Sequence, residues 1–250
     1  MPGFTCTHTI PFRGVDDDYR ANLSCVMELM LEASLQHNEA TPHPSSWFWA
    51  NGFGFLLTHW QAAIDKYPRW NEQVTMRTWP AGSIGFVAYR SFEMLDKNGE
   101  SLARANSGWA FVDMRKRAPA RPPADLIAGY GPSMPDVMPK DFRLPGLEAF
   151  TEIGSRNKSV TKRDMDANRH VNSIAYLDWA MDSLTLHGLS QNGRAVEMKT
   201  AYRKECTIGA EVEILTYSDV WDCSRAMVQI RESEGEKALL CEVFMKLGEA

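Results

Sequence analysis

The chain has 250 residues, of which 44% are hydrophobic and 24% are charged, and its net charge is -5. A chain of this length can bury a substantial core, either as one large domain or as two of ordinary size. The acidic balance argues against nucleic acid as the main partner, because duplex binding usually shows as a basic net charge or stripe. No stretch approaches the roughly 18 apolar residues of a membrane span, so the sequence predicts no membrane insertion.

The start of the chain and its cysteines indicate an intracellular protein, and the spacing of its histidines indicates no metal site. The beginning of the chain lacks the cationic and apolar segments of a secretion signal, so we expect a soluble protein that is not exported. The cysteines form an odd set without a CxxC pair, which suggests neither a disulfide framework nor a zinc ribbon. The six histidines show no metal-ligand spacing such as HExxH. We therefore expect a cytoplasmic protein that holds no metal ion.

The most informative feature is an internal repeat with an offset of 150 residues. Asp16 in the first half and Asp166 in the second each precede a run of apolar residues at helical spacing. An asparagine follows each aspartate at the same distance, so the two halves stay in register. The patterns predict helices over residues 19–35 and 171–186.

Segments rich in β-branched and aromatic residues follow each helix and predict strands. They cover residues 47–64, 74–79, 84–95 and 101–114 in the first half, and 194–206, 210–218, 221–232 and 237–247 in the second. Turn signals at residues 97–99 and 233–235 predict hairpins. Each half therefore predicts an α+β unit in which an antiparallel sheet packs against one long helix.

A proline-rich segment separates the two copies. Seven prolines fall between residues 117 and 145, a density that excludes long regular structure. We expect an N-terminal unit at residues 1–116, a linker at 117–150 and a C-terminal unit at 151–250.

Two motifs are found in the second copy: the stretch from Asp164 to Asn172 has the pattern D-x-D-x-N-x-H-V-N, and residues 202–206 have the pattern Y-R-x-E-C. They resemble the signature segments of plant and bacterial acyl-(acyl carrier protein) thioesterases. Residues 70–72, 78–80 and 88–90 also resemble family segments, so the likeness spans nearly the whole chain. The resemblance implies a tandem double hot-dog fold, in which each unit wraps a long helix in a curved antiparallel sheet.

The resemblance also implies an activity. The expected reaction is hydrolysis of fatty acyl-acyl carrier protein to free fatty acid and carrier protein, without a dissociable cofactor. The plant signature has Trp-Ser where this chain has Lys162 and Arg163, and the plant proteins begin with a transit peptide, so the resemblance is to a bacterial-type, cytoplasmic relative. Basic clusters at residues 115–121, 158–163 and 203–204 would attract an acidic carrier protein.

The resemblance implies that Asp166, Asn168, His170 and Glu205 are catalytic, all in the second unit. A thiol is a weak acid with a pKa near roughly 8.5, so the leaving group of a thioester needs little protonation. The demanding steps are activation of water and stabilisation of the oxyanion. Asp166 and Glu205 would align and deprotonate water, and which of them is the base stays open. Asn168 and His170 would orient the carboxylate and the substrate.

Two further predictions concern the oxyanion and the nucleophile. The backbone amides of Val171 and Asn172 are the expected oxyanion donors, since the first-turn amides of a helix lack intrahelical partners. The alternative mechanism uses Cys206 as nucleophile, His170 as its base and Asn168 as the orienting residue. We place it behind water attack, because a carboxylate neighbour such as Glu205 would disfavour the thiolate. Strand parity leaves open whether Glu205 faces the cavity.

The first unit is expected to be noncatalytic and to shape the acyl-chain pocket. Arg20 stands where the second copy has His170, and an arginine cannot serve as a base near neutrality. The aromatic run between Trp47 and Leu56 is the expected pocket region, although such runs more often form core. An acyl-CoA thioesterase and a catalytically silent acyl-binding protein are the alternative functions. Acyl chain length, saturation and a homodimer stay open.

Overall fold

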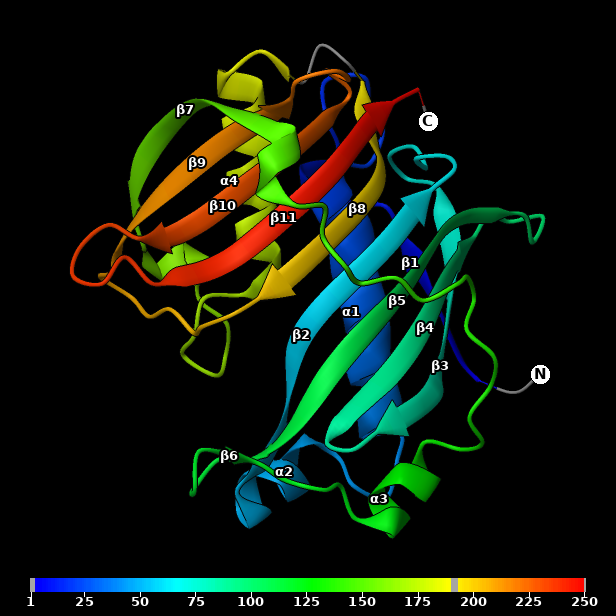
Figure 1. Cartoon of the computed structure of the whole chain (residues 1–250). Helices are drawn as coiled ribbons and strands as arrows, with labels where there is room; N and C mark the ends of the chain where they lie inside the picture. The colour runs from blue at the N-terminus through cyan, green and yellow to red at the C-terminus, as the bar shows by residue number, and fades with distance from the viewer. Residues whose placement is uncertain (1–2, 190–192, 250) are drawn as a thin grey trace. The chain divides into compact units, whose positions relative to one another are not determined.

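The computed structural model describes residues 3–189 and 193–249. The chain divides into two compact units, Met1–Asp141 and Phe142–Ala250 (Figure 1). The division falls inside the segment that the sequence predicts as a linker. Among the described residues, no helix combines the length and apolar character that a bilayer crossing requires.

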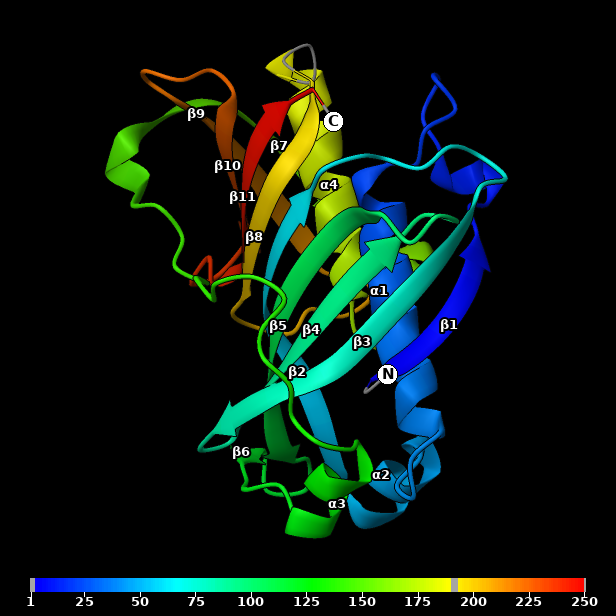
Figure 2. The same cartoon turned by 90° about the vertical axis from the view of Figure 1, so that its right-hand side faces the viewer.

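The first unit packs one long helix, α1 (Leu23–Glu39), against a five-stranded antiparallel sheet in the order β1-β3-β4-β5-β2. The strands are β1 (Phe4–Thr9), β2 (Phe53–Ile64), β3 (Gln73–Ile84), β4 (Val87–Leu95) and β5 (Ser101–Asp113), and the short β6 (Ala118–Pro119) pairs with β5. Figure 2 shows this sheet curving around α1. The helix presents Val26, Met27 and Met30 to the core, where all three are fully buried.

The helix α1 begins four residues later than the periodicity predicts. Asn22 caps it by accepting a hydrogen bond from the Cys25 amide at 2.8 Å. The preceding residues form a tight turn instead, in which Tyr19 has a φ of 62°. A residue in the left-handed region cannot continue a right-handed helix, so the start shifts to Leu23.

The predicted strand at residues 47–64 is wrong in its first part. Residues Ser45–Asn51 form the helix α2, which ends at Gly52 with a φ of 72°. Gly52 donates its amide to the Phe48 carbonyl at 2.9 Å, a helix-ending geometry that glycine favours. Of this aromatic run, Phe48 packs in the core, in a buried cluster with Phe111 and Leu126.

Much of the proline-rich segment packs on the first unit. Its short helix α3 (Ala124–Gly129) buries Leu126 completely. Further along, Trp79 Nε1 donates to the Pro135 carbonyl at 2.9 Å, and Asn106 Nδ2 donates to the Met138 carbonyl at 2.8 Å. This part of the segment is therefore a component of the first unit rather than a free connection.

The second unit repeats the plan with the helix α4 (Ser173–Leu186) and a sheet in the order β8-β11-β10-β9-β7. The strands, all paired antiparallel, are β7 (Phe150–Ser159), β8 (Arg194–Tyr202), β9 (Glu211–Asp219), β10 (Arg225–Glu232) and β11 (Leu239–Gly248). The predicted α+β class, with one long helix and one antiparallel sheet in each unit, is confirmed.

Candidate active site

The loop between β7 and α4 holds three predicted catalytic residues and is anchored by a buried aspartate. Thr161 donates to Asp164 Oδ2 from its amide and from its hydroxyl, both at 2.7 Å. Trp179 Nε1, on α4, donates to Asp164 Oδ1 at 3.1 Å, and Lys158 Nζ lies 3.3 Å from the same oxygen. Sequence analysis does not foresee this anchoring role, although Asp164 opens the family-like signature.

The carboxyl group of Asp164 is held in its ionised form. Burial alone would raise its pKa, but the hydrogen bonds from Thr161, Trp179 and Lys158 outweigh burial and hold that pKa below its ordinary value. The ionised Asp164 carboxylate thus fixes the loop to α4 and accepts hydrogen bonds from the buried donors around it.

Asp166, Asn168 and His170 come together in one turn immediately after this anchor. Asp166 Oδ1 accepts the amide of Asn168 at 2.8 Å and the amide of His170 at 3.3 Å. Asn168 Nδ2 donates to Asp166 Oδ2 at 3.3 Å. Arg169, between the last two residues, has a φ of 67°, which lets the turn close. The Asp166 carboxylate is therefore largely occupied by its own loop.

Glu205 meets this turn through His170. The Nε2 atom of His170 lies 3.5 Å from Glu205 Oε2, an ion-pair distance, and the side chains are 31% and 43% exposed. A backbone hydrogen bond of 2.9 Å from Val171 to the Cys206 carbonyl holds the two segments together. The strand β8 ends at Tyr202, so its predicted extension to Cys206 is wrong. Strand parity does not apply to Glu205, which lies in an irregular segment.

Cys206 is placed poorly for nucleophilic attack. Its side chain is buried, and Sγ makes its hydrogen-bonding contact with the Thr207 carbonyl at 4.0 Å. Within residues 3–189 and 193–249, no hydrogen bond joins Cys206 Sγ to His170. Burial raises the pKa of the Cys206 thiol, and the charge of Glu232 adds to this effect. The thiolate is thus disfavoured mainly by burial, and not by the expected carboxylate of Glu205.

The backbone amides of Val171 and Asn172, the predicted oxyanion donors, both have backbone acceptors in the structure. The Val171 amide donates to the Cys206 carbonyl at 2.9 Å, and the Asn172 amide donates to the Asp164 carbonyl at 2.8 Å. The sequence pattern places the helix start at Val171, but α4 begins at Ser173. The two amides therefore belong to the extended approach to the helix, where backbone partners satisfy them.

Aromatic packing joins the helix α4 to the strand β8 beside the site. Tyr202 Oη donates to the Ser173 carbonyl at 3.0 Å. The ring of Tyr176 lies 5.1 Å from that of Trp179 and 5.8 Å from that of Tyr202, measured between centroids. Tyr202 belongs to the Y-R-x-E-C segment, and this motif is the sequence feature that could have indicated its contacts with Ser173 and Tyr176.

The first unit contains the same loop with the same backbone. Asp16 donates its amide to the Arg20 carbonyl at 2.9 Å, as Asp166 does to the His170 carbonyl at 2.9 Å. In both loops the third residue after the aspartate has a positive φ, of 62° and 67°. Residues 150 positions apart in the sequence therefore also occupy equivalent positions in the structures of the two loops.

The chemistry of the two loops differs. Arg20 Nε lies 3.7 Å from Asp18 Oδ2 at the position of the histidine. The Ala21 amide donates to the Pro68 carbonyl at 2.8 Å, and this bond corresponds to the one from Val171 to the Cys206 carbonyl in the second unit. Tyr67 then stands where the second unit has its glutamate. The histidine and glutamate pair is thus a feature of the second unit alone in this repeat.

In the part of the chain that the structure describes, no three histidine, cysteine or acidic side chains are grouped so that they could hold a metal ion. The site consists of two carboxylates, an imidazole and a carboxamide. These groups suit proton transfer to and from water.

Comparison with protein families gives two matches in chain order. The family model described as the acyl-ACP thioesterase N-terminal domain matches residues 3–130, and the acyl-ACP thioesterase C-terminal domain matches residues 148–243. The His170–Glu205 pair lies inside the second match.

Known relatives and solved structures agree with these matches. A chloroplastic palmitoyl-acyl carrier protein thioesterase from Cuphea hookeriana is 28% identical over 81% of this chain, and the chain spans 51% of that relative. An acyl-ACP thioesterase from Bacteroides thetaiotaomicron superposes with a TM-score of 0.82 at 20% identity, covering 97% of this chain and 96% of its own. A 12:0-ACP thioesterase from Umbellularia californica gives a TM-score of 0.80 at 21% identity, with coverage of 97% and 96%. The two structures confirm the predicted hot-dog fold.

Asp164→Asn tests the anchor of the loop. The pKa of Asp164 is lowered in the folded state, so its stabilising effect is present above the ordinary carboxyl pKa of about 4 and is lost as pH falls through the folded-state value. We expect the variant to lose about 1–3 kcal/mol of unfolding free energy at pH 7 and progressively less below about pH 4. Urea denaturation across pH measures this. Asp17→Asn, an exposed aspartate of the corresponding loop, is the control. An equal loss in both variants, or a loss independent of pH, would contradict the role of Asp164.

Proposed function

Because the chain belongs to the acyl-ACP thioesterase family, we propose that it hydrolyses fatty acyl thioesters of acyl carrier protein to free fatty acid and carrier protein. The observation that supports this most directly is the pairing of His170 with Glu205 beside the Asp166 turn, within the part matched by the C-terminal family model. The chain spans about half the length of several curated relatives that it matches, so their activity is a proposal here.

Glu205 is our choice for the general base. The Asp166 carboxylate accepts hydrogen bonds from the amides of Asn168 and His170 and from the Asn168 side chain. The ion-pair or hydrogen-bond partner of Glu205 among the described residues is His170, which leaves carboxylate lone pairs to accept a proton from water. Asp166 then orients the loop, and Glu205 performs the proton transfer.

The proposed reaction begins with attack by water on the thioester carbonyl carbon. Glu205 takes the proton as the new carbon–oxygen bond forms, and His170 steadies the charge of the pair. Asn168 Nδ2 has a second hydrogen beyond the one given to Asp166, and it is our candidate donor to the oxyanion in place of the Val171 and Asn172 amides. Collapse of the tetrahedral intermediate breaks the carbon–sulfur bond, and the proton passes from the His170–Glu205 pair to the leaving sulfur.

Exposed cations on the catalytic loop support the carrier protein as partner. Lys158, Arg203 and Lys204 are engaged with acidic side chains. In contrast, Lys162 and Arg163 are exposed, and within the described residues neither makes an ion pair. Of the basic residues predicted to attract a carrier protein, these two lie near the site and remain open to an acidic partner. The cytoplasmic location, a homodimer and an acyl pocket in the first unit stay predictions.

Substitution of the proposed catalytic residues tests the function. We expect Glu205→Gln and His170→Asn to lower kcat by roughly 10²–10⁴-fold, because each removes a group that acts in proton transfer. Asp166→Asn tests the orienting carboxylate. Cys206→Ala should retain most activity. Free-thiol release from acyl-acyl carrier protein measures the effect, with Asp16→Asn, the corresponding residue of the first unit, as the matched control.

Other outcomes would change the assignment. Selective loss of activity in Cys206→Ala would identify the cysteine as nucleophile. Absence of thiol release from any acyl thioester by the folded wild type would leave an acyl-binding protein.

A double substitution, Lys162→Glu with Arg163→Glu, tests the carrier. We expect KM for acyl-acyl carrier protein to rise by roughly tenfold, with kcat nearly unchanged, because surface charge mainly steers encounter. Turnover of acyl-CoA should change much less. Lys97→Glu with Lys237→Glu makes the same charge change at two exposed positions elsewhere and is the control. Turnover of acyl-CoA that equals or exceeds that of the carrier-linked substrate would favour the acyl-CoA thioesterase instead.

A further inference from the structure

One end of the first unit gathers the end of α2 and the turns of two hairpins. The Met114 amide, in the β5–β6 turn, donates to the Gly52 carbonyl at 2.9 Å, and Arg115 Nη2 donates to the Ala50 carbonyl at 3.1 Å. The Phe111 amide donates to the Phe86 carbonyl of the β3–β4 turn at 2.8 Å. Figures 1 and 2 show α2 and β6 together at this end of the unit. We call residues 49–52, 83–87 and 113–127 the α2 end.

The α2 end exposes large apolar side chains. Trp49 is 71% exposed, Ile84 74%, Phe86 45% and Met114 42%. Each lies at a chain turn or at the end of a helix or strand, where a side chain projects away from the core. The surface of a soluble protein normally exposes large apolar residues singly, whereas four of them lie at this one end of the unit.

The α2 end also carries basic side chains: Arg115, Lys116, Arg117 and Arg121 are all exposed. The two acidic residues of this end already have partners. Asp113 lies 3.6 Å from Lys116 Nζ, and Asp125 lies 3.2 Å from His43 Nε2. Within the described residues, Arg117 and Arg121 make no ion pair. The α2 end is therefore a positively charged surface with exposed apolar groups.

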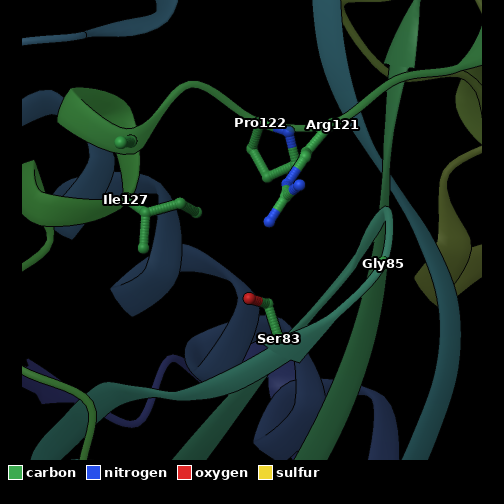
Figure 3. A pocket seen from close by; sticks show the side chains of 6 residues that line it. Ser83, Gly85, Arg121, Pro122 and Ile127 are labelled. Carbon is green, nitrogen blue, oxygen red and sulfur yellow. The ribbon is translucent and has the colours of Figure 1, made fainter.

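A pocket of about 300 Å³ opens in this surface, lined by Ser83, Gly85, Arg121, Pro122, Ala124 and Ile127. Figure 3 shows the Arg121 guanidinium and the Ser83 hydroxyl pointing into the same space, with Ile127 at its side. A guanidinium and a hydroxyl are suitable donors to a phosphate oxygen. The pocket thus offers an anion site next to exposed apolar side chains.

Proteins that bind peripherally to anionic membranes combine two kinds of side chain. Cationic side chains bind the lipid headgroups, and aromatic and aliphatic side chains beside them enter the membrane interface. We propose that the α2 end binds the surface of an anionic lipid bilayer, with the pocket of Arg121 and Ser83 taking a headgroup phosphate. Docking of an acidic protein would use the same cations, but it gives no reason for four exposed apolar side chains at the same end of the unit. The binding is peripheral and independent of the proposed hydrolysis.

Vesicle co-sedimentation of the full chain tests this proposal. Vesicles of phosphatidylcholine mixed with phosphatidylglycerol should bind at least about tenfold more protein than phosphatidylcholine alone, and added salt should weaken binding. Arg117→Glu with Arg121→Glu should lower the partition coefficient by about tenfold or more. Trp49→Ser with Phe86→Ser should weaken binding even at low salt, because it removes apolar contact area.

Matched controls change the same chemistry elsewhere on the surface. Lys97→Glu with Lys237→Glu reproduces the change in net charge, and Trp221→Ser removes an indole that is 92% exposed. Both controls should bind like the wild type. Equal binding to neutral and anionic vesicles, or equal losses in controls and α2-end variants, would overturn the proposal. A raised KM for acyl-acyl carrier protein in Arg117→Glu with Arg121→Glu, without vesicle binding by the wild type, would identify a carrier-protein surface instead. Vesicle binding needs no hydrolysis, so a failure of the proposed function would not affect this measurement.

Discussion

The backbone amide of Val171 donates a hydrogen bond of 2.9 Å to the carbonyl of Cys206, and the arrangement of the candidate site depends on this bond. It joins the loop after β7 to the segment after β8, so that His170 and Glu205 meet from positions far apart in sequence. The first unit makes the corresponding bond from Ala21 at 2.8 Å. The fold therefore builds this junction twice, and the side chains beside it decide which copy has catalytic groups.

The sequence repeat predicts this duplication because backbone register depends on features that recur in both halves. An aspartate opens each loop, a residue with positive φ lets it turn, and an asparagine precedes each helix. The residue types in the second loop also indicate its chemistry, since an imidazole can exchange protons near neutrality and the arginine of the first loop cannot.

Other details depend on local hydrogen bonds that periodicity does not report. Composition cannot distinguish a helix from a strand at Trp47, because buried aromatic residues suit both, and the left-handed Gly52 decides the outcome. Likewise, the expected oxyanion role of Val171 rests on a helix start placed two residues too early. The amide has a backbone partner across the junction, which only the tertiary structure reveals.

The most direct test of the account is a double-mutant cycle in kcat between His170→Asn and Glu205→Gln, measured by thiol release. If the junction makes the two side chains one proton-transfer unit, the double variant should be about as slow as the slower single variant, since either change already disables the pair. Losses that multiply would show that the two residues act independently, and they would contradict the account.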